Sequence, residues 1–371
     1  MNYRLIAFTA LLFLLPVISK AESKITWQDR SQEIPQTVLD EHISSAYLSF
    51  SASRGDEWLV GNPNQLLQVL PDKTINLTPQ LSDIGYKNIR QVASDGEGWL
   101  IIGDSSIWLS ESDLAFRYDG MYWKNVSHIL TSLPAQEWLG TVIGKHGIWI
   151  IPTEHHLYMW HEALNEPAII PLPDALNEPR VSPLSFNAVR EGWIVDFVQQ
   201  NGPKSIVWGS PQYDKRFFFF DGQNFQEITS KLGSPSIYSA LGSNGNEILL
   251  IGAITSPKDN TFQFVALRTD GQKIINVTRN FRYIFSNNLT LPQQPFLTQS
   301  RITWNGKTWI LIDQAKNCAT FDNTNPVASC GLTKDTFLNL GYGLNGKTIS
   351  VGFAKNQQNQ IIPRLVELNI K

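Results

Sequence analysis

The stretch from residue 91 to 130 alternates short apolar runs with turn residues in a regular order. Its second apolar run, 99–102, has no polar position, which is typical of a strand covered on both faces. Asp95-Gly96 precedes this run and Asp119-Gly120 follows a later one. Such dipeptides favour tight hairpin turns because glycine tolerates positive φ. The pattern predicts four short antiparallel strands, namely 91–94, 99–102, one ending at Tyr118, and 122–126.

Weaker copies of this unit follow one another along the chain. The first turn recurs as a glycine, two residues, and a tryptophan or isoleucine, although His146 and Arg190 replace the glycine in two copies. The apolar anchors are spaced by 40 to 61 residues, a scale that suits four-stranded propeller blades. The seven anchors are Trp58, Trp99, Trp149, Trp193, Ile248, Trp309 and Ile349.

The second turn recurs at the same place in the repeat. Asp119-Gly120, Asp221-Gly222 and Asp270-Gly271 each begin a segment that ends in an apolar residue followed by serine or threonine. Length alone suggests two domains, but an uninterrupted repeat favours one closed unit because each blade needs neighbours. We therefore predict a single domain over residues 22–371.

The two ends of the repeat region complement each other. Residues 24–32 resemble a fourth strand, because Trp27 and Ser31 fall where Trp123 and Ser127 fall in the unit above. The C-terminal end supplies a second and a third strand but no fourth. We predict an all-β, seven-bladed β-propeller of four-stranded antiparallel blades, closed by the N-terminal strand, which completes the last blade and removes the free edges.

Residues 1–21 have the pattern of a signal peptide. Arg4 precedes an apolar run, 5–15, and Ser19-Lys20-Ala21 forms a small-x-small cleavage site. The run is too short and too early for a membrane span. We expect an exported monomer, secreted or periplasmic. Cleavage changes the formal net charge from −3 to −5, which argues against nucleic-acid or anionic-membrane binding.

Three places depart from the repeat. Residues 162–183 are rich in proline, and we predict a wandering surface loop there. Residues 201–215 look like an insertion in the fourth blade. Cys318 and Cys330 are the only cysteines, and in an exported protein we expect them to form a disulfide that pins one loop of the sixth blade.

The Asn-x-Ser/Thr triplets that begin at Asn76, Asn125, Asn276 and Asn288 match glycosylation acceptors. The first three also coincide with the strand ending of the repeat. We therefore interpret these three as structural.

Candidate chemistry is sparse. Glu154-His155-His156 and His161-Glu162 contain zinc-type ligands, but their spacing fits no metal motif, so we predict solvated turn histidines and no metal site. The chain lacks the motifs of nucleophilic, phosphate-binding and dinucleotide sites, so we predict no catalytic and no cofactor-binding residue. Asp196 lies in an apolar strand, where a carboxylate is either functional or lies at the strand end, facing turn amides or channel water. We favour the second interpretation.

Aromatic residues suggest one candidate ligand patch. Phe219 lies in a run of four phenylalanines and aligns with Arg117 and Arg268, which suggests an outward position. Together with Trp208 and Tyr213 it is a candidate patch for a glycan or a protein partner. The alternative, which we favour, is that the preceding insertion folds back and covers the ring.

The G-x-x-W and Y-D-G-x-x-[W/F]-x-N-[V/L]-[S/T] elements resemble divergent bacterial and archaeal β-propeller repeats, WD40-like or kelch-like in a broad sense. The resemblance covers nearly all of the chain after residue 21 and implies a scaffold whose loops bind a ligand. Our leading hypothesis is an exported, non-catalytic propeller that binds a protein or a glycan. The alternative is a glycoside hydrolase whose channel is lined by Asp196, Asp313 and Glu154. A third is a component of an envelope assembly, which predicts a large exposed apolar patch.

Overall fold

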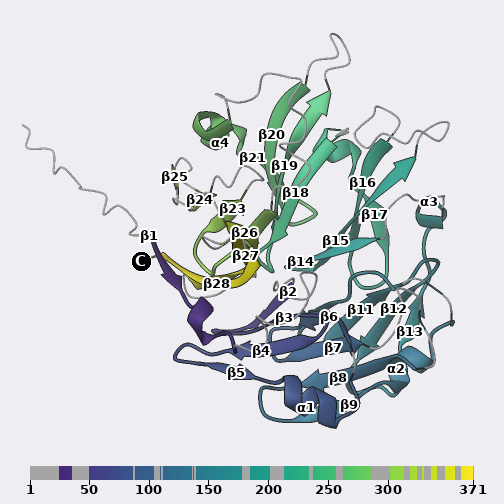
Figure 1. The fold of residues 1–371 in the computed structure, drawn as a ribbon. Helices are drawn as coiled ribbons and strands as arrows, with labels where there is room; N and C mark the ends of the chain where they lie inside the picture. Colours follow the sequence, from purple (N-terminus) through teal and green to yellow (C-terminus); the bar gives the residue numbers. More distant parts are fainter. Residues whose placement is uncertain are drawn as a thin grey trace, which may run out of the picture.

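Seven four-stranded antiparallel sheets form the molecule, which confirms the predicted seven-bladed propeller. Figure 1 shows the sheets arranged side by side around a common centre. The computed structural model describes residues 25–35, 50–86, 88–103, 109, 112–135, 137, 139–177, 184–200, 213–233, 237–255, 262–285, 301–312, 318–323, 328–329, 336–340, 347–355 and 361–370.

The first four blades follow the chain without crossovers. Blade 1 consists of β2 (Phe50–Arg54), β3 (Glu57–Asn62), β4 (Gln65–Val69) and β5 (Thr74–Asn76). Blade 2 consists of β6 (Ile89–Ser94), β7 (Trp99–Gly103), β8 (Leu114–Tyr118) and β9 (Trp123–Asn125). Blade 3 consists of β10 (Ile143–Lys145), β11 (Ile148–Pro152), β12 (Leu157–His161) and β13 (Ala168–Ile170). Blade 4 consists of β14 (Ser185–Val189), β15 (Gly192–Gln200), β16 (Tyr213–Phe220) and β17 (Phe225–Glu227).

Blades 5 and 6 repeat this order, and blade 7 takes its outer strand from the N-terminal end. Blade 5 consists of β18 (Ile237–Ser243), β19 (Ile248–Thr255), β20 (Phe262–Thr269) and β21 (Ile274–Asn276). Blade 6 consists of β22 (Arg301–Trp304), β23 (Trp309–Ile312), β24 (Cys318–Phe321) and β25 (Ala328–Ser329). Blade 7 consists of β26 (Thr336–Leu340), β27 (Lys347–Lys355), β28 (Ile361–Ile370) and β1 (Ile25–Asp29).

Short helical segments follow several outer strands. They are η1 (Ser31–Glu33), α1 (Thr78–Asp83), α2 (His128–Thr131), α3 (Asp174–Asn177), η3 (Ser230–Leu232) and α4 (Thr278–Phe285). No helix in the described ranges is long and apolar enough to cross a membrane.

The ring closes as predicted. β1 pairs antiparallel with β28, from Ile25 opposite Ile370 to Asp29 opposite Val366, and Figure 1 shows the purple and yellow strands side by side. The innermost strands β2, β6, β10, β14, β18, β22 and β26 contact one another in a complete cycle. The closure therefore joins blade 7 to blade 1 and gives every blade two neighbours.

The hydrophobic core lies between the sheets. One cluster, with Leu100 and Trp149, joins blades 2 and 3, and another, with Trp309 and Phe281, joins blades 5 and 6. All four of these side chains are 0% exposed, and three of them are aromatic rings. Both faces of a blade are thus covered by its neighbours, which explains why the second strands lack polar positions.

In five of the blades, a serine or threonine after the outer strand fastens this strand to the third strand. The Ser127 hydroxyl oxygen accepts a hydrogen bond from the Ala115 backbone N–H at 3.0 Å. In blade 7, the Ser31 hydroxyl oxygen accepts the equivalent bond from the Leu365 backbone N–H at 3.1 Å. The predicted alignment of Ser31 with Ser127 is therefore confirmed in three dimensions.

The glycosylation-like asparagines have a structural role in the same turn. The Oδ1 atoms of Asn76, Asn125 and Asn276 each accept a hydrogen bond from the backbone N–H two residues later, at 2.9 to 3.0 Å. This bond is an Asx turn, which redirects the chain after the outer strand.

The Asp-Gly turns hold their own backbone amides. The Asp119 carboxylate accepts hydrogen bonds from the Met121 and Tyr122 amides at 2.8 Å each, while Gly120 has a φ of +99°. These backbone bonds lower the pKa of Asp119, and the bond from Tyr122 has the largest effect. Asn305 makes the same pair of bonds in another turn, so a neutral acceptor also suffices.

We expect Asp119→Ala to lower the free energy of unfolding by about 1 kcal/mol at pH 7, because two amides lose their acceptor. Since folding lowers the pKa of Asp119, its contribution is complete above the unfolded pKa of about 3.9 and is lost as pH falls through the folded pKa. The difference between the two proteins should therefore shrink below about pH 4 in urea unfolding. Asp119→Asn is the control, and a pH-independent effect of the alanine variant would contradict the assignment.

The proline-rich segment 162–183 is more regular than predicted. It contains the outer strand of blade 3, β13, and the helix α3. Pro167 and Pro171 flank β13 and do not interrupt it, so they satisfy the rule that proline avoids strand interiors. The expectation of a wandering loop is wrong for this part of the segment.

Candidate ligand-binding site

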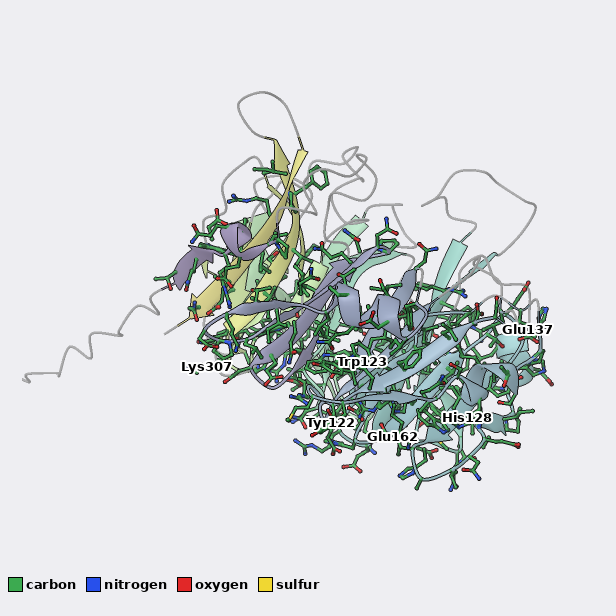
Figure 2. The ribbon with its side chains drawn as sticks, turned by 60° about the horizontal axis from the view of Figure 1, so that its bottom comes forward. Tyr122, Trp123, His128, Glu137, Glu162 and Lys307 are labelled. Carbon is green, nitrogen blue, oxygen red and sulfur yellow. The ribbon has the colours of Figure 1, made fainter. Side chains whose placement is uncertain are left out.

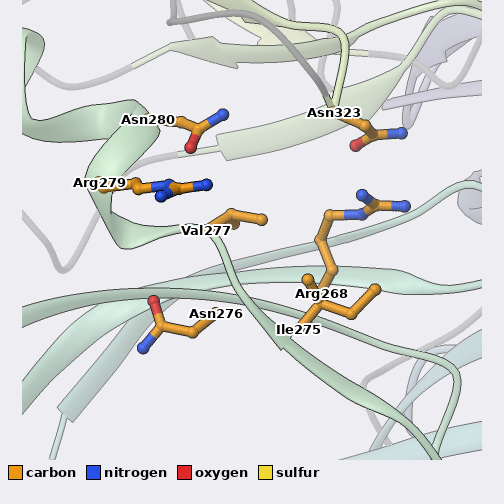
Figure 3. Close-up of a pocket in the computed structure, with 7 residues that line it drawn as sticks. All are labelled: Arg268, Ile275, Asn276, Val277, Arg279, Asn280 and Asn323. Carbon is orange, nitrogen blue, oxygen red and sulfur yellow. The ribbon is translucent and has the colours of Figure 1, made fainter.

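A polar cleft of about 440 Å³ lies between blades 5 and 6. Figure 3 shows its side chains, which come from β20, β21, the start of α4 and the segment after β24. The described lining residues are Arg268, Ile275, Asn276, Val277, Arg279, Asn280 and Asn323. None of these is a carboxylate, a cysteine or a histidine.

The strand ending of blade 5 places one wall of the cleft. Arg268 on β20 lies opposite Ile275 on β21 in the sheet register. The Val277 amide then donates to the Ala266 carbonyl at 2.9 Å, which fixes the path of the chain from β21 into α4. This path places Asn276, Arg279 and Asn280 along the cleft. Arg279 is exposed.

Arg268 is held in place by the carboxylate of Glu247. Its Nε donates to the Glu247 carboxylate at 3.0 Å, and its Nη2 donates to the same oxygen. The Arg268 and Glu247 side chains are 16% and 17% exposed. This half-buried pair orients the guanidinium, while Arg279 adds a second cation.

Blade 6 supplies the opposite wall through Asn323. This residue has a φ of +73°, a left-handed conformation that asparagine tolerates better than most residues. Its Oδ1 accepts a hydrogen bond from the indole N–H of Trp309, the blade 6 anchor, at 2.8 Å. The anchor tryptophan thus fixes the amide that faces the cleft.

Phe219 does not face solvent. Its ring is 8% exposed and packs in the cluster between blades 4 and 5. Its alignment with Arg117 is sound, but both positions face the next blade, because Arg117 lies 5.0 Å from the centre of the Trp149 ring. Trp208 lies outside the described residues, and the Tyr213 side chain is not described, so the aromatic patch stays a prediction.

The burial of Phe219 depends on Gly271. A Cβ built on Gly271 would lie 2.3 Å from the Phe219 ring, and φ is +94°. Gly245 has a similar φ of +82° but open space around it.

We expect Gly245→Ala to cost about 1–2 kcal/mol from backbone strain alone. Gly271→Ala should cost about 1–3 kcal/mol more, because the ring must shift. Urea unfolding of both variants measures the difference. Equal losses would show that the ring moves freely and that Phe219 is not tightly covered.

The acids of the predicted channel do not converge among the described residues. Asp196 is 5% exposed and is bound by Lys215 at 2.8 Å and by the Asn187 amide at 3.4 Å, all on blade 4. Glu154 follows β11 of blade 3 and is exposed. Asp313 lies outside the described residues. Asp196 therefore lies within β15 rather than at the strand end that the sequence predicts, and its partners are the side chains of Lys215 and Asn187 on its own blade.

The histidine cluster separates into two structural contacts. His156 Nδ1 lies 2.8 Å from Glu137, whose other oxygen accepts a hydrogen bond from Thr153. The His161 ring accepts the Ala163 amide instead, at 3.1 Å. No group of three metal ligands forms among the described residues. In Figure 2, Glu137 lies across the molecule from Lys307 on blade 6.

The predicted disulfide is outside the description. Cys318 begins β24, but its side chain is not described, and Cys330 lies outside the described residues.

Sequence reasoning missed the cleft residues. In the sequence, Asn276 indicates only the end of a repeat, and Arg279-Asn280 occupies the same place as Pro79-Gln80 and Ser230-Lys231 after other blades, so it carries no distinct signal. Asn323 carries no signal of its own, because its role depends on contact with blade 5.

No family model matches the chain, and no curated protein matches it. Among solved structures it is similar to Pyrococcus horikoshii acylaminoacyl peptidase, with a TM-score of 0.51 and 11% identity over 86% of this chain and 50% of that chain. It is also similar to Porphyromonas gingivalis dipeptidyl peptidase 4 (TM-score 0.47, 10% identity, 90% of this chain and 55% of that chain). A further similar structure is polysaccharide lyase Uly1 (TM-score 0.46, 9% identity, 91% and 95%). The chain spans about half the length of these peptidases. At these identities the similarity shows the propeller fold alone.

Proposed function

We propose that this protein is an exported, non-catalytic propeller that binds a glycan in the cleft between blades 5 and 6. The observation that carries the proposal is the composition of the cleft. Its described lining combines two guanidinium groups, three amides and only two apolar side chains. A pocket of this kind suits a hydrated, oxygen-rich ligand better than an apolar one.

The contacts of the described acids support binding over hydrolysis. A glycoside hydrolase commonly needs two carboxyl groups within about 5–10 Å, flanking one bond. Asp196 is held by Lys215 on blade 4, and Glu154 belongs to blade 3. Neither lines the cleft.

A protein partner is the second candidate, and a different surface favours it. Met121 and Tyr122 are 75% and 70% exposed at the turn between β8 and β9. Figure 2 shows Tyr122 at the edge of blade 2. Methionine and tyrosine are enriched at protein interfaces relative to the rest of the surface.

Export is part of the proposal and rests on residues 1–21. N-terminal sequencing of the protein recovered from the secreted or periplasmic fraction tests it. A mature terminus at Glu22 supports export, and an intact Met1 in the cytoplasmic fraction contradicts it.

A glycan array probed with the purified protein and with Arg279→Ala tests the binding function. We expect binding to one class of glycan, loss of that binding in the variant, and no release of sugar. Arg279 is exposed, so the variant should keep the urea midpoint of the parent protein. If Arg279→Ala binds as strongly as the parent protein, the binding site lies outside this cleft. Release of sugar would favour the hydrolase.

A further inference from the structure

The amide oxygens on two sides of the cleft are already occupied. Asn276 Oδ1 accepts the Thr278 backbone N–H at 3.0 Å, and Asn323 Oδ1 accepts the Trp309 indole N–H at 2.8 Å. Backbone and indole N–H groups only donate. The chemistry of these partners therefore fixes which end of each amide is the oxygen.

Each oxygen has one lone pair engaged in this way, and each amide also carries an NH₂ group that can donate to a ligand. The guanidinium groups of Arg268 and Arg279 also carry donors and no acceptor. Figure 3 shows Arg268, Arg279, Asn280 and Asn323 around the same space. The cleft is thus rich in donors, contributed by two different blades.

The charge of the cleft points in the same direction. Glu247 neutralises Arg268, while Arg279 leaves the described lining positive. The chain as a whole has a formal net charge of −3, so this cleft differs in sign from the average surface. A neutral sugar hydroxyl both donates and accepts, whereas a carboxylate or sulfate only accepts. Donor-rich, positive linings therefore select oxyanions.

We propose that the cleft binds the oxyanion of an acidic glycan, either the carboxylate of a uronic acid or a sulfate ester. This inference rests on the proposed glycan-binding function and narrows its ligand class. Arg279 and the Asn323 NH₂ group are the main contacts, and Arg268, which is paired with Glu247, supports them from the same lining.

Two substitutions remove the proposed contacts with little change in fold. Asn323→Asp keeps an oxygen for Trp309 and replaces the NH₂ donor by a negative oxygen. Arg279→Ala removes an exposed cation. The matched control is Lys273→Ala, which removes an exposed cation from the same blade outside the described lining. Urea unfolding confirms that each variant is folded.

Isothermal titration of the full-length protein tests the inference with three probes: oligogalacturonate, its methyl ester, and a sulfated galactose oligosaccharide. We expect binding of one or both acidic probes and none of the neutral ester. Asn323→Asp and Arg279→Ala should each weaken binding about tenfold or more, and Lys273→Ala less than about twofold. Which acidic probe binds more tightly identifies the carboxylate or the sulfate as the source.

Other outcomes separate the two proposals. Binding of the methyl ester with the same dependence on Arg279 would overturn the oxyanion inference and leave the glycan-binding function standing. Failure of all three probes, together with an array on which no glycan binds, would overturn both. Equal affinity of all variants for the acidic probes would show that the ligand binds outside this cleft.

Discussion

Replacing Arg30 by alanine is expected to lower the free energy of unfolding by about 3 kcal/mol or more. Arg30 is 1% exposed and donates to Glu33 at 2.7 and 2.8 Å, to Glu367 at 3.0 Å and to the Leu70 carbonyl at 2.9 Å. These partners belong to both sides of the seam between blades 7 and 1. Among the described residues, the substitution leaves the buried Glu367 with Lys347, at 3.6 Å, as its remaining cation.

Urea unfolding at pH 7 measures this loss. Arg364→Ala is the matched control, because Arg364 also pairs with an acid across blade 7 but that acid, Asp29, is 49% exposed. Exposed pairs contribute about 1 kcal/mol or less. Similar losses in both variants would mean that the seam is held by its apolar cluster and that the buried charges add nothing specific.

The second large effect is expected at the seam between blades 2 and 3. Arg117 Nη2 donates to Asp95 at 2.7 Å, and the Asp95 side chain is 0% exposed. Arg117 also binds Glu162 and lies over the Trp149 ring. Arg117→Met keeps much of the packing but leaves the buried carboxylate without its cation. We expect a loss of about 3 kcal/mol.

Glu162→Gln provides the comparison for Arg117→Met. The Glu162 side chain is 33% exposed, so loss of its charge should cost less than about 1 kcal/mol. Asp95 also accepts amide hydrogen bonds from Glu97, Gly98 and Gly147. If Arg117→Met costs no more than Glu162→Gln, these amides alone stabilise the carboxylate.

The fold could be predicted from the sequence because its signals are local. The turns at Asp119-Gly120 and Asp221-Gly222 determine hairpins within a few residues, and the repeated spacing then limits the number of blades. Ring closure was also predictable, since Ser31 repeats the role of Ser127 in a short, recognisable segment.

The site could not be predicted in the same way because it depends on contacts between blades. Phe219 has the outward position in its own sheet, yet blade 5 covers it through Gly271. Asn323 gains its importance from Trp309 and from Arg279 across the cleft. A pattern within one strand tells which face a side chain takes, but not what lies against that face.

The pairing of β1 with β28 also has a consequence for biosynthesis. β1 leaves the ribosome before every other described strand, and β28 leaves after all of them. Blade 7 therefore stays incomplete until translation has passed residue 370. A chain that ended after β27 would expose unpaired edges on β1 and β27, and such edges pair readily with other chains. Assembly of the ring therefore requires that β28 has been synthesised.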